Sequence, residues 1–124
     1  MIQGKVTDHR EAVIDVSIRR SDGQRDTVAA IIDTGFNGEM TLPPALVQQL
    51  GLKFVGNRTA TLADGSDVVL DVFLATLDWD GEDREVLALQ SEGGPLIGME
   101  LLWGFTVTMH VVSNGRVEIV ENAP

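Results

Sequence analysis

A run of small and apolar residues that stops at an acid is the feature that most constrains this chain. Five consecutive residues, Val28 to Ile32, are typical of a strand covered on both faces, and Asp33 follows them directly. Gly35 and Gly38 then allow the backbone to turn tightly. We therefore expect Asp33 to lie in a tight loop at the end of a buried strand. Its carboxylate must there be hydrogen-bonded, paired or protonated.

The length and composition favour one domain that spans residues 1–124. A chain of 124 residues can bury about two-thirds of its unfolded surface. Its 44% of apolar residues argues against disorder, and no apolar run approaches the length of a membrane helix. The N-terminal residues do not have the layout of a secretory signal, and the chain has no cysteine. We expect a soluble protein in the cytoplasm, without a membrane partner.

The charge balance argues against a nucleic-acid partner. Nineteen acidic and nine basic residues give a formal net charge of −10, which repels a phosphate backbone. Such a charge favours cationic or neutral partners, or it only keeps the protein soluble.

Short strands joined by turns dominate the rest of the pattern. Hairpin turns are expected at residues 21–24, 63–66 and 79–82 and at Asn114-Gly115, where Gly follows Asp or Asn. A two-turn helix is expected between Pro43 and Gly51, and a shorter one over residues 99–102. The expected strands cover residues 2–6, 13–19, 25–32, 59–62, 67–77, 85–90, 105–112 and 116–120. This pattern predicts a mainly β fold, closed or sandwiched.

One family shares the order of these features. Two apolar residues precede Asp33-Thr34-Gly35, a helix-like stretch follows, and Leu96-Ile97-Gly98 comes about sixty residues later. With Thr41-Leu42-Pro43, this order resembles the single-domain, retropepsin-like aspartic proteases, above all the small bacterial and archaeal members. The resemblance covers residues 13–112. It implies a closed retropepsin-like β-barrel with one or two short helices, one lobe per chain.

The resemblance also implies roles for individual residues. Asp33 would be the catalytic carboxylate, Thr34 would form a hydrogen bond across a dimer, and Gly35 would let the substrate backbone pass closely. The turn formed by Ala63, Asp64, Gly65 and Ser66 would be the tip of a flap over the substrate. Phe36 and Asn37 would line the pocket, and Leu96, Ile97 and Gly98 would lie against the aspartate loop.

The chemistry of such a site requires two carboxylates within hydrogen-bond distance that share one proton. This chain contains a single Asp-Thr-Gly. The resemblance therefore implies a homodimer that hydrolyses peptides or unfolded proteins with one Asp33 from each copy and no cofactor.

Two positions depart from the better-known members. Phe36 stands where a small residue is usual, and it is expected to narrow or reshape the pocket beside Asp33. Asn37 and Met99 occupy the places of an acid and an arginine that form a salt bridge in retroviral members. That salt bridge cannot form here, so the geometry of the dimer is less constrained than the fold.

Other chemistries have weaker support. His9 and His110 are isolated, so no metal site is expected at them. The cluster of Asp78, Asp80, Glu82 and Asp83 does not have the spacing of a calcium loop, and it is interpreted as a solvated hairpin tip. No serine nucleophile has a histidine partner by motif.

Three functions are compatible with these observations. The first is a homodimeric aspartic endopeptidase. The second is a dimeric peptide-binding or assembly module with the same fold and little catalysis. The third is a structural β-domain in which Asp33 only caps a turn, because Asp, Thr and Gly also end strands in proteins without catalytic function.

Overall fold

The computed structural model describes residues 1–124, and most of them lie in ten strands and two short helices. The strands are β1 (Ile2–Val6), β2 (Ala12–Arg19), β3 (Arg25–Ile32), β4 (Met40–Leu42), β5 (Lys53–Thr61), β6 (Asp67–Trp79), β7 (Glu82–Gln90), β8 (Leu96–Ile97), β9 (Phe105–Met109) and β10 (Arg116–Glu121). The helices are α1 (Pro44–Leu50) and α2 (Met99–Leu102). The mainly β prediction is confirmed. None of the helices is long and apolar enough to cross a membrane.

Six strands form a closed ring. The sheet has the order β5-β6-β7-β4-β8-β3-β2-β1-β10-β9, and an additional pairing of Ile18 in β2 with Leu77 in β6 joins the two sides of the central part. The ring therefore runs β6-β7-β4-β8-β3-β2 and returns to β6. This arrangement agrees with the predicted barrel.

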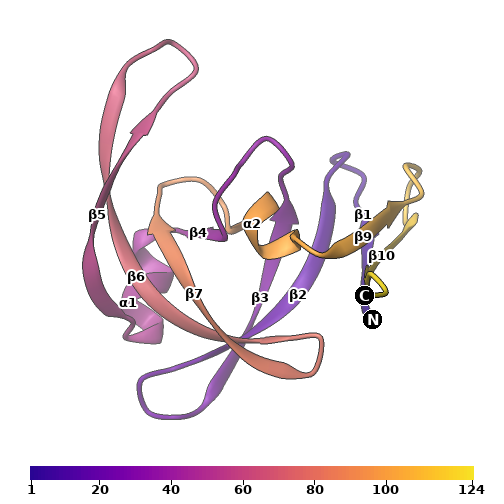
Figure 1. Cartoon of the computed structure of the whole chain (residues 1–124), viewed down its shortest axis with the longest axis horizontal. Coiled ribbons are helices and arrows are strands. Elements are labelled where there is room, and N and C mark those ends of the chain that lie inside the picture. The colour runs from indigo at the N-terminus through magenta and orange to yellow at the C-terminus, as the bar shows by residue number, and fades with distance from the viewer.

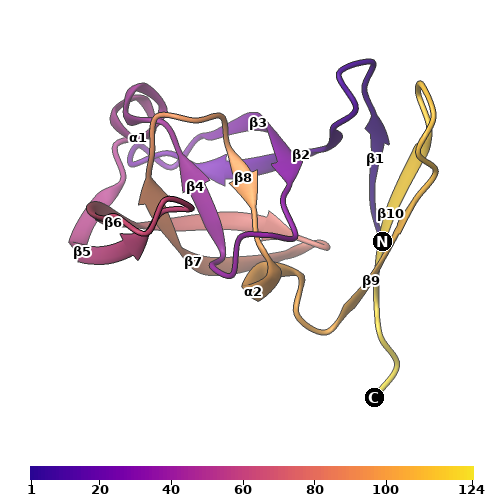
Figure 2. The ribbon, with the colours of Figure 1, turned by 90° about the horizontal axis from the view of Figure 1, so that it is seen from above.

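Two parts of the sheet extend beyond the ring. The β5–β6 hairpin projects from one side, and its turn lies at the outer end (Figure 1). On the other side, β1, β10 and β9 form an arm that joins the ring through the pairing of Gly4–Val6 with Ala12–Ile14 (Figure 2). The barrel between these two parts carries the aspartate loop.

One connected cluster of 21 buried hydrophobic residues fills the barrel and extends into the arm through Val6, Val117 and Ile119. Ile14, Val16 and Ile18 of β2 point into it, as their alternation with polar residues predicts. The prediction that β3 is covered on both faces is wrong. Ala29 is exposed and Ile31 is half-buried, while Val28, Ala30 and Ile32 are buried. In β3, therefore, only one face packs on the core.

Turn chemistry explains most of the predicted boundaries. Asp80 and Gly81 have φ of 56° and 87°, as a two-residue hairpin between β6 and β7 requires. Gly51 ends α1 in the left-handed conformation with φ of 65°. The strand β9 ends at Met109 rather than at 112, and β7 begins at Glu82 rather than at 85.

The acidic residues at the β6–β7 turn are mostly exposed, as predicted, and two of them form ion pairs. Asp83 accepts hydrogen bonds from Arg25 at 2.6 Å and from Arg19 at 2.5 Å. Asp80 pairs with the Met1 ammonium group, and Asp78 accepts from the Gly81 N–H group. This turn therefore ties β6–β7 to the β2–β3 hairpin.

The Asp83 pair predicts a pH-dependent effect on stability. The hydrogen bond from Arg25, followed by the charges of Arg25 and Arg19, holds the pKa of Asp83 below its ordinary 3.8 although desolvation opposes the shift. A lowered pKa stabilises the fold above the unfolded-state value, and this contribution disappears as the pH falls through the folded-state value. Urea midpoints of Asp83→Asn should lie below those of the native chain at neutral pH and converge with them in acid. A gap that is equal at every pH would contradict this assignment.

Candidate active site

Residues 33–39 form the loop between β3 and β4, and this loop presents Asp33 at the surface. The Asp33 N–H group donates to the Ile97 carbonyl at 2.9 Å, which fixes the backbone. The Gly35 N–H group donates to Asp33 Oδ1 at 2.9 Å. The half-buried carboxylate has no other hydrogen bond within the chain, so Oδ2 is free for a further partner.

Thr34 and Gly35, the two residues after Asp33, are exposed and do not cover the Asp33 carboxylate. Thr34 is exposed, and its hydroxyl group has no hydrogen-bond partner within the chain. A Cβ atom at Gly35 would lie 3.2 Å from Asp33 Oδ1, which is a tight contact for a carbon atom. Glycine at this position therefore lets the backbone N–H group approach the carboxylate without displacing it.

The predicted support by Leu96, Ile97 and Gly98 is present in the structure. Strand β8 pairs in parallel with the end of β3, placing Ile97 opposite Ile32. The Gly98 N–H group donates to the Glu39 carbonyl at 3.0 Å. A Cβ atom at Gly98 would lie 2.2 Å from the Gly38 carbonyl oxygen, so only glycine fits here without movement of the loop.

Phe36 packs within the loop. Its half-buried ring lies so close to two glycines that a Cβ atom at Gly38 or at Gly98 would approach it to 2.5 Å. Asn37 is exposed and makes no side-chain hydrogen bond. The Met99 N–H group donates to the Phe36 carbonyl at 2.8 Å. This backbone contact joins α2 to the loop.

The predicted flap tip lies at the outer end of the β5–β6 hairpin, away from the loop (Figure 1). The tight turn over residues 63–66 is confirmed, since the Leu62 N–H group donates to the Ser66 carbonyl at 2.7 Å. The Ser66 hydroxyl and N–H groups donate to Asp64, and these bonds hold the pKa of Asp64 below its ordinary value. The structure does not bring Ala63, Asp64, Gly65 or Ser66 against Asp33.

A cavity of about 310 Å³ lies between the loop and the middle of the β5–β6 hairpin, where Arg58 pairs with Leu70. Its lining comes from the loop, β5, β7 and α2, and it consists of Asn37, Gly38, Glu39, Arg58, Leu87, Leu89 and Glu100. The sequence reasoning did not select Glu39, Arg58 or Glu100. Of these three, only Glu39 could have been selected from the sequence, because it is an acid that directly follows the predicted loop.

Glu39 extends a strand ladder with its side chain. Strand β4 begins at Met40, which is paired with Ala88 in β7. One residue earlier, Glu39 Oε1 accepts a hydrogen bond from the Leu87 N–H group at 2.9 Å. Glu39 Oε2 lies 3.5 Å from the Arg84 guanidinium group. Strand β4 begins only at Met40, so the Leu87 N–H group bonds to the side-chain carboxylate of Glu39 instead of to a backbone carbonyl of β4.

Two substitutions of Glu39 distinguish the contribution of its hydrogen bond with Leu87 from that of its ion pair with Arg84. Glu39→Ala should lower the free energy of unfolding by about 1 kcal/mol, because the Leu87 N–H group loses its acceptor. Glu39→Gln keeps an amide oxygen at that place and loses only the partly exposed ion pair, so its effect should be smaller. Urea denaturation of both variants tests this order. Equal losses in the two variants would assign the effect to the charge.

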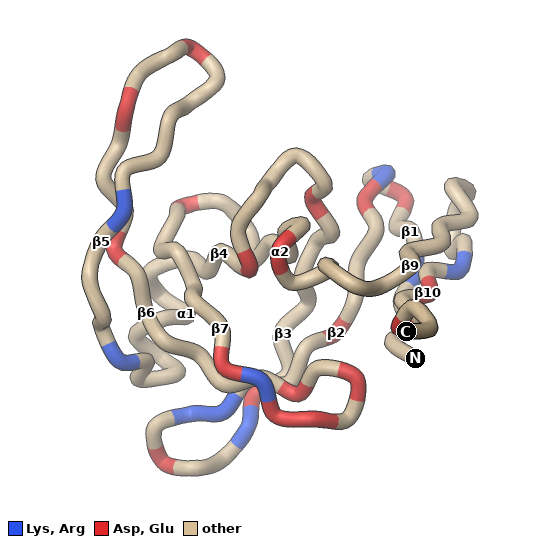
Figure 3. Tube along the Cα trace, in the orientation of Figure 1, with Lys and Arg blue, Asp and Glu red and all other residues tan.

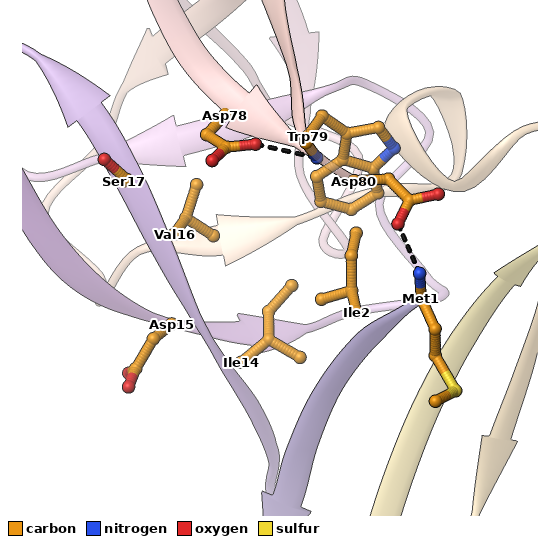
Figure 4. A pocket seen from close by; sticks show the side chains of 10 residues that line it. Met1, Ile2, Ile14, Asp15, Val16, Ser17, Asp78, Trp79 and Asp80 are labelled. Atoms are coloured by element: carbon orange, nitrogen blue, oxygen red, sulfur yellow. Dashed lines mark hydrogen bonds and ion pairs between the residues drawn. The ribbon is translucent and has the colours of Figure 1, made fainter.

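A larger hollow of about 420 Å³ lies elsewhere, between β1, β2 and the β6–β7 turn (Figure 4). Ile2, Ile14 and Trp79 contribute apolar walls, and Asp80 in its rim is paired with the Met1 ammonium group. The buried Trp79 ring packs edge-on against Phe105 with 5.9 Å between centroids, and its Nε1 atom has no partner. No residue of the aspartate loop lines this hollow.

Comparison with known proteins identifies the fold. No protein-family model and no curated protein sequence matches the chain. Among solved structures, a retropepsin-like aspartic protease from Rickettsia conorii aligns with a TM-score of 0.62 and 14% identity over 99% of this chain and 91% of that chain. The Simian Foamy Virus (mac) protease aligns with a TM-score of 0.50 and 17% identity over 69% of this chain and 86% of that chain. The chain therefore has a retropepsin-like fold.

Proposed function

We propose that residues 1–124 form one aspartic endopeptidase domain that is active as a homodimer, with one Asp33 from each copy. The observation that carries the proposal is the state of Asp33 in its loop. One carboxylate oxygen is held by the Gly35 N–H group, and the other has no partner within the chain. The retropepsin-like fold supports this assignment, and so does the unpartnered, exposed hydroxyl group of Thr34.

The reaction needs both copies because one chain supplies one such carboxylate. Two carboxylates at hydrogen-bond distance share a proton, since like charges that close do not both ionise. The ionised one takes a proton from water as the water oxygen attacks the peptide carbonyl carbon. The protonated one donates to the carbonyl oxygen. Collapse of the tetrahedral intermediate then breaks the C–N bond, and the amine leaves with a proton from the dyad.

Substrates in this proposal are peptides or unfolded proteins that enter between the loop and the β5–β6 hairpin as a flap. The cavity formed by Glu39, Arg58 and Leu87 would take a substrate side chain beside the loop. No cofactor takes part in these steps. The cytoplasmic location expected from the sequence remains a prediction.

Cleavage of a mixed peptide library by the native chain, by Asp33→Asn and by Asp15→Asn tests the proposal. Asp15 is an exposed acid of β2 without hydrogen bonds or ion pairs, so it controls for the loss of one charge. The native chain and Asp15→Asn should cleave the same bonds, at a rate that rises faster than linearly with protein concentration. Asp33→Asn should cleave none. Absence of cleavage by a proven dimer would favour the peptide-binding module instead.

A further inference from the structure

Five Asp or Asn residues of this chain are followed directly by glycine. The pairs are Asp22-Gly23, Asn37-Gly38, Asp64-Gly65, Asp80-Gly81 and Asn114-Gly115. In such a pair the glycine nitrogen can attack the side-chain carbonyl carbon of the residue before it, because glycine has no side chain to block the approach. The reactivity of each pair then depends on what the glycine nitrogen contacts in the folded chain.

Four of the five glycine N–H groups are held by hydrogen bonds within hairpin turns. These bonds, 2.8 to 3.0 Å long, join Gly23 to Arg20, Gly65 to Leu62, Gly81 to Asp78 and Gly115 to Val112. The Gly38 N–H group has no acceptor within the chain. A nitrogen that donates a hydrogen bond must lose that bond before it attacks, so the Gly38 nitrogen is the most reactive of the five.

The Asn37-Gly38 pair lies in an open part of the loop between β3 and β4. That loop carries no charge between Asp33 and Glu39 (Figure 3). Asn37 is exposed, and its side chain makes no hydrogen bond that would hold Cγ away from the Gly38 nitrogen. Phe36 requires glycine at position 38, since a Cβ atom there would approach its ring to 2.5 Å. The packing of the loop thus selects the residue that leaves the nitrogen unshielded.

The other Asn-Gly pair is held firmly and provides an internal comparison. Asn114 is exposed, but it has φ of 59° in the turn between β9 and β10. Its N–H group donates to Val6 at 3.0 Å, and the N–H group of the buried Gly115 donates to Val112 at 2.8 Å. The two pairs have the same chemistry, so a difference in their reactivity measures the effect of the structure.

We propose that Asn37 is a site of spontaneous deamidation in the folded chain. Water or hydroxide removes the proton of the Gly38 nitrogen, and this nitrogen forms a bond to Asn37 Cγ. The Cγ–Nδ2 bond breaks, ammonia leaves with a proton from water, and a succinimide ring closes. Addition of water at Cγ then breaks the new N–Cγ bond and leaves an aspartate. Addition at the backbone carbonyl carbon breaks the original peptide bond instead and leaves an isoaspartate.

The aspartate product changes the charge of the cavity beside the loop. Asn37 lines this cavity together with Glu39, Arg58 and Glu100. A third carboxylate would join two acids and one guanidinium group there. The modified cavity therefore favours a basic side chain of a ligand more strongly than the native cavity does.

The isoaspartate product lengthens the loop backbone, because the chain then runs through Cβ and Cγ. Asn37 stands between two carbonyl groups that bind successive N–H groups of α2. Phe36 accepts from Met99 at 2.8 Å, and Gly38 accepts from Glu100 at 3.2 Å. A longer backbone between these carbonyls cannot keep both bonds in their present geometry, so the loop must shift. The effect of either product on peptide cleavage rests on the proposed function, whereas the modification does not.

Ageing of the intact chain in mildly alkaline buffer, followed by tryptic digestion and mass spectrometry, tests the proposal. Trypsin cuts after Lys and Arg, so Asn37 and Asn114 fall in separate peptides that cover residues 26–53 and 85–116, and each peptide contains a single Asn. Deamidation adds about 1 Da to a peptide. In the folded chain, this gain should be at least about tenfold faster in residues 26–53 than in residues 85–116.

Two controls assign the difference to the structure and to Asn37. In urea the hydrogen bonds of the turns are lost, so the rates in the two peptides should become about equal. Asn37→Gln keeps a primary amide but places its carbonyl carbon one methylene farther from the Gly38 nitrogen. In this variant the gain in residues 26–53 should stop, while the slow gain in residues 85–116 continues.

Three results would overturn the proposal. These are no gain of mass in residues 26–53 of the folded chain, equal rates for the two peptides in the folded chain, or a gain in residues 26–53 that persists in Asn37→Gln. A chain that is modified at Asn37 but cleaves no peptide, either fresh or aged, would leave the modification established and would count against the proposed protease alone.

Discussion

Asp33→Asn is expected to abolish peptide hydrolysis, with a loss of about 10⁴-fold or more in kcat. Asparagine keeps an oxygen that accepts the Gly35 N–H group, so the loop geometry should survive. It cannot take a proton from water, and it cannot share one with the other copy. Rates of peptide cleavage under saturating substrate measure the loss.

The same substitution should strengthen association of the two copies at neutral pH. Two facing carboxylates repel each other unless they share a proton, whereas two amides carry no charge. We expect the dimer dissociation constant of Asp33→Asn to fall by about tenfold. Asp15→Asn, which removes an exposed charge on β2, should not change it. Unchanged association together with full activity would mean that Asp33 only caps the turn.

Gly98→Ala is expected to cost about 3 kcal/mol in the free energy of unfolding, a large fraction of the stability of a domain of this size. The new methyl group would lie 2.2 Å from the Gly38 carbonyl oxygen and 2.5 Å from the Phe36 ring. Neither neighbour can move freely, because Gly38 belongs to the loop backbone and Phe36 is held by the Met99 N–H group. Activity should fall as well, since the displaced loop carries Asp33.

Gly93→Ala is the matched control for that substitution. Gly93 lies five residues before Gly98, in the connection between β7 and β8, and an added Cβ atom there meets nothing within 4 Å. Its backbone is not in the left-handed region. Thermal unfolding should place Gly93→Ala within about 0.5 kcal/mol of the native chain. Equal losses in both variants would show that the contact at Gly98 is not the cause.

The order of strands and turns could be predicted where local chemistry decides it. Asp80-Gly81 and Asn114-Gly115 specify tight turns through residues that accept positive φ, and both lie between the expected strands. Proline before α1 and Gly51 after it mark that helix equally well. These signals lie in a few neighbouring residues, so they can be recognised without knowledge of the tertiary structure.

Other elements depend on tertiary contacts and could not be predicted. The three-residue strand β4 is too short to show a period, and it exists because it lies between β7 and β8. Strand β5 begins six residues before the expected Thr59, because nearly all of its side chains are exposed and show no alternation. The exposure of Ala29 likewise follows from the neighbours of β3 and not from its own apolar sequence.

The candidate site likewise has one part that could be predicted from the sequence and one part that could not. Asp33, Thr34, Gly35 and the supporting Gly98 lie in contiguous motifs, and the structure places them in one loop and its support. The cavity beside the loop combines Glu39, Arg58 and Glu100 from three separate elements. Only the closure of the barrel brings these side chains together, so no short sequence pattern contains them.

The central claim is that two Asp33 carboxylates from two copies form one active site, and mixing native chains with Asp33→Asn chains tests it most directly. At constant total protein, active sites in this account require two native copies. Activity should fall below a straight line in the native fraction, to about one quarter at equal amounts when copies exchange randomly. A strictly linear fall, to about one half, would show that each chain works alone and would contradict the account.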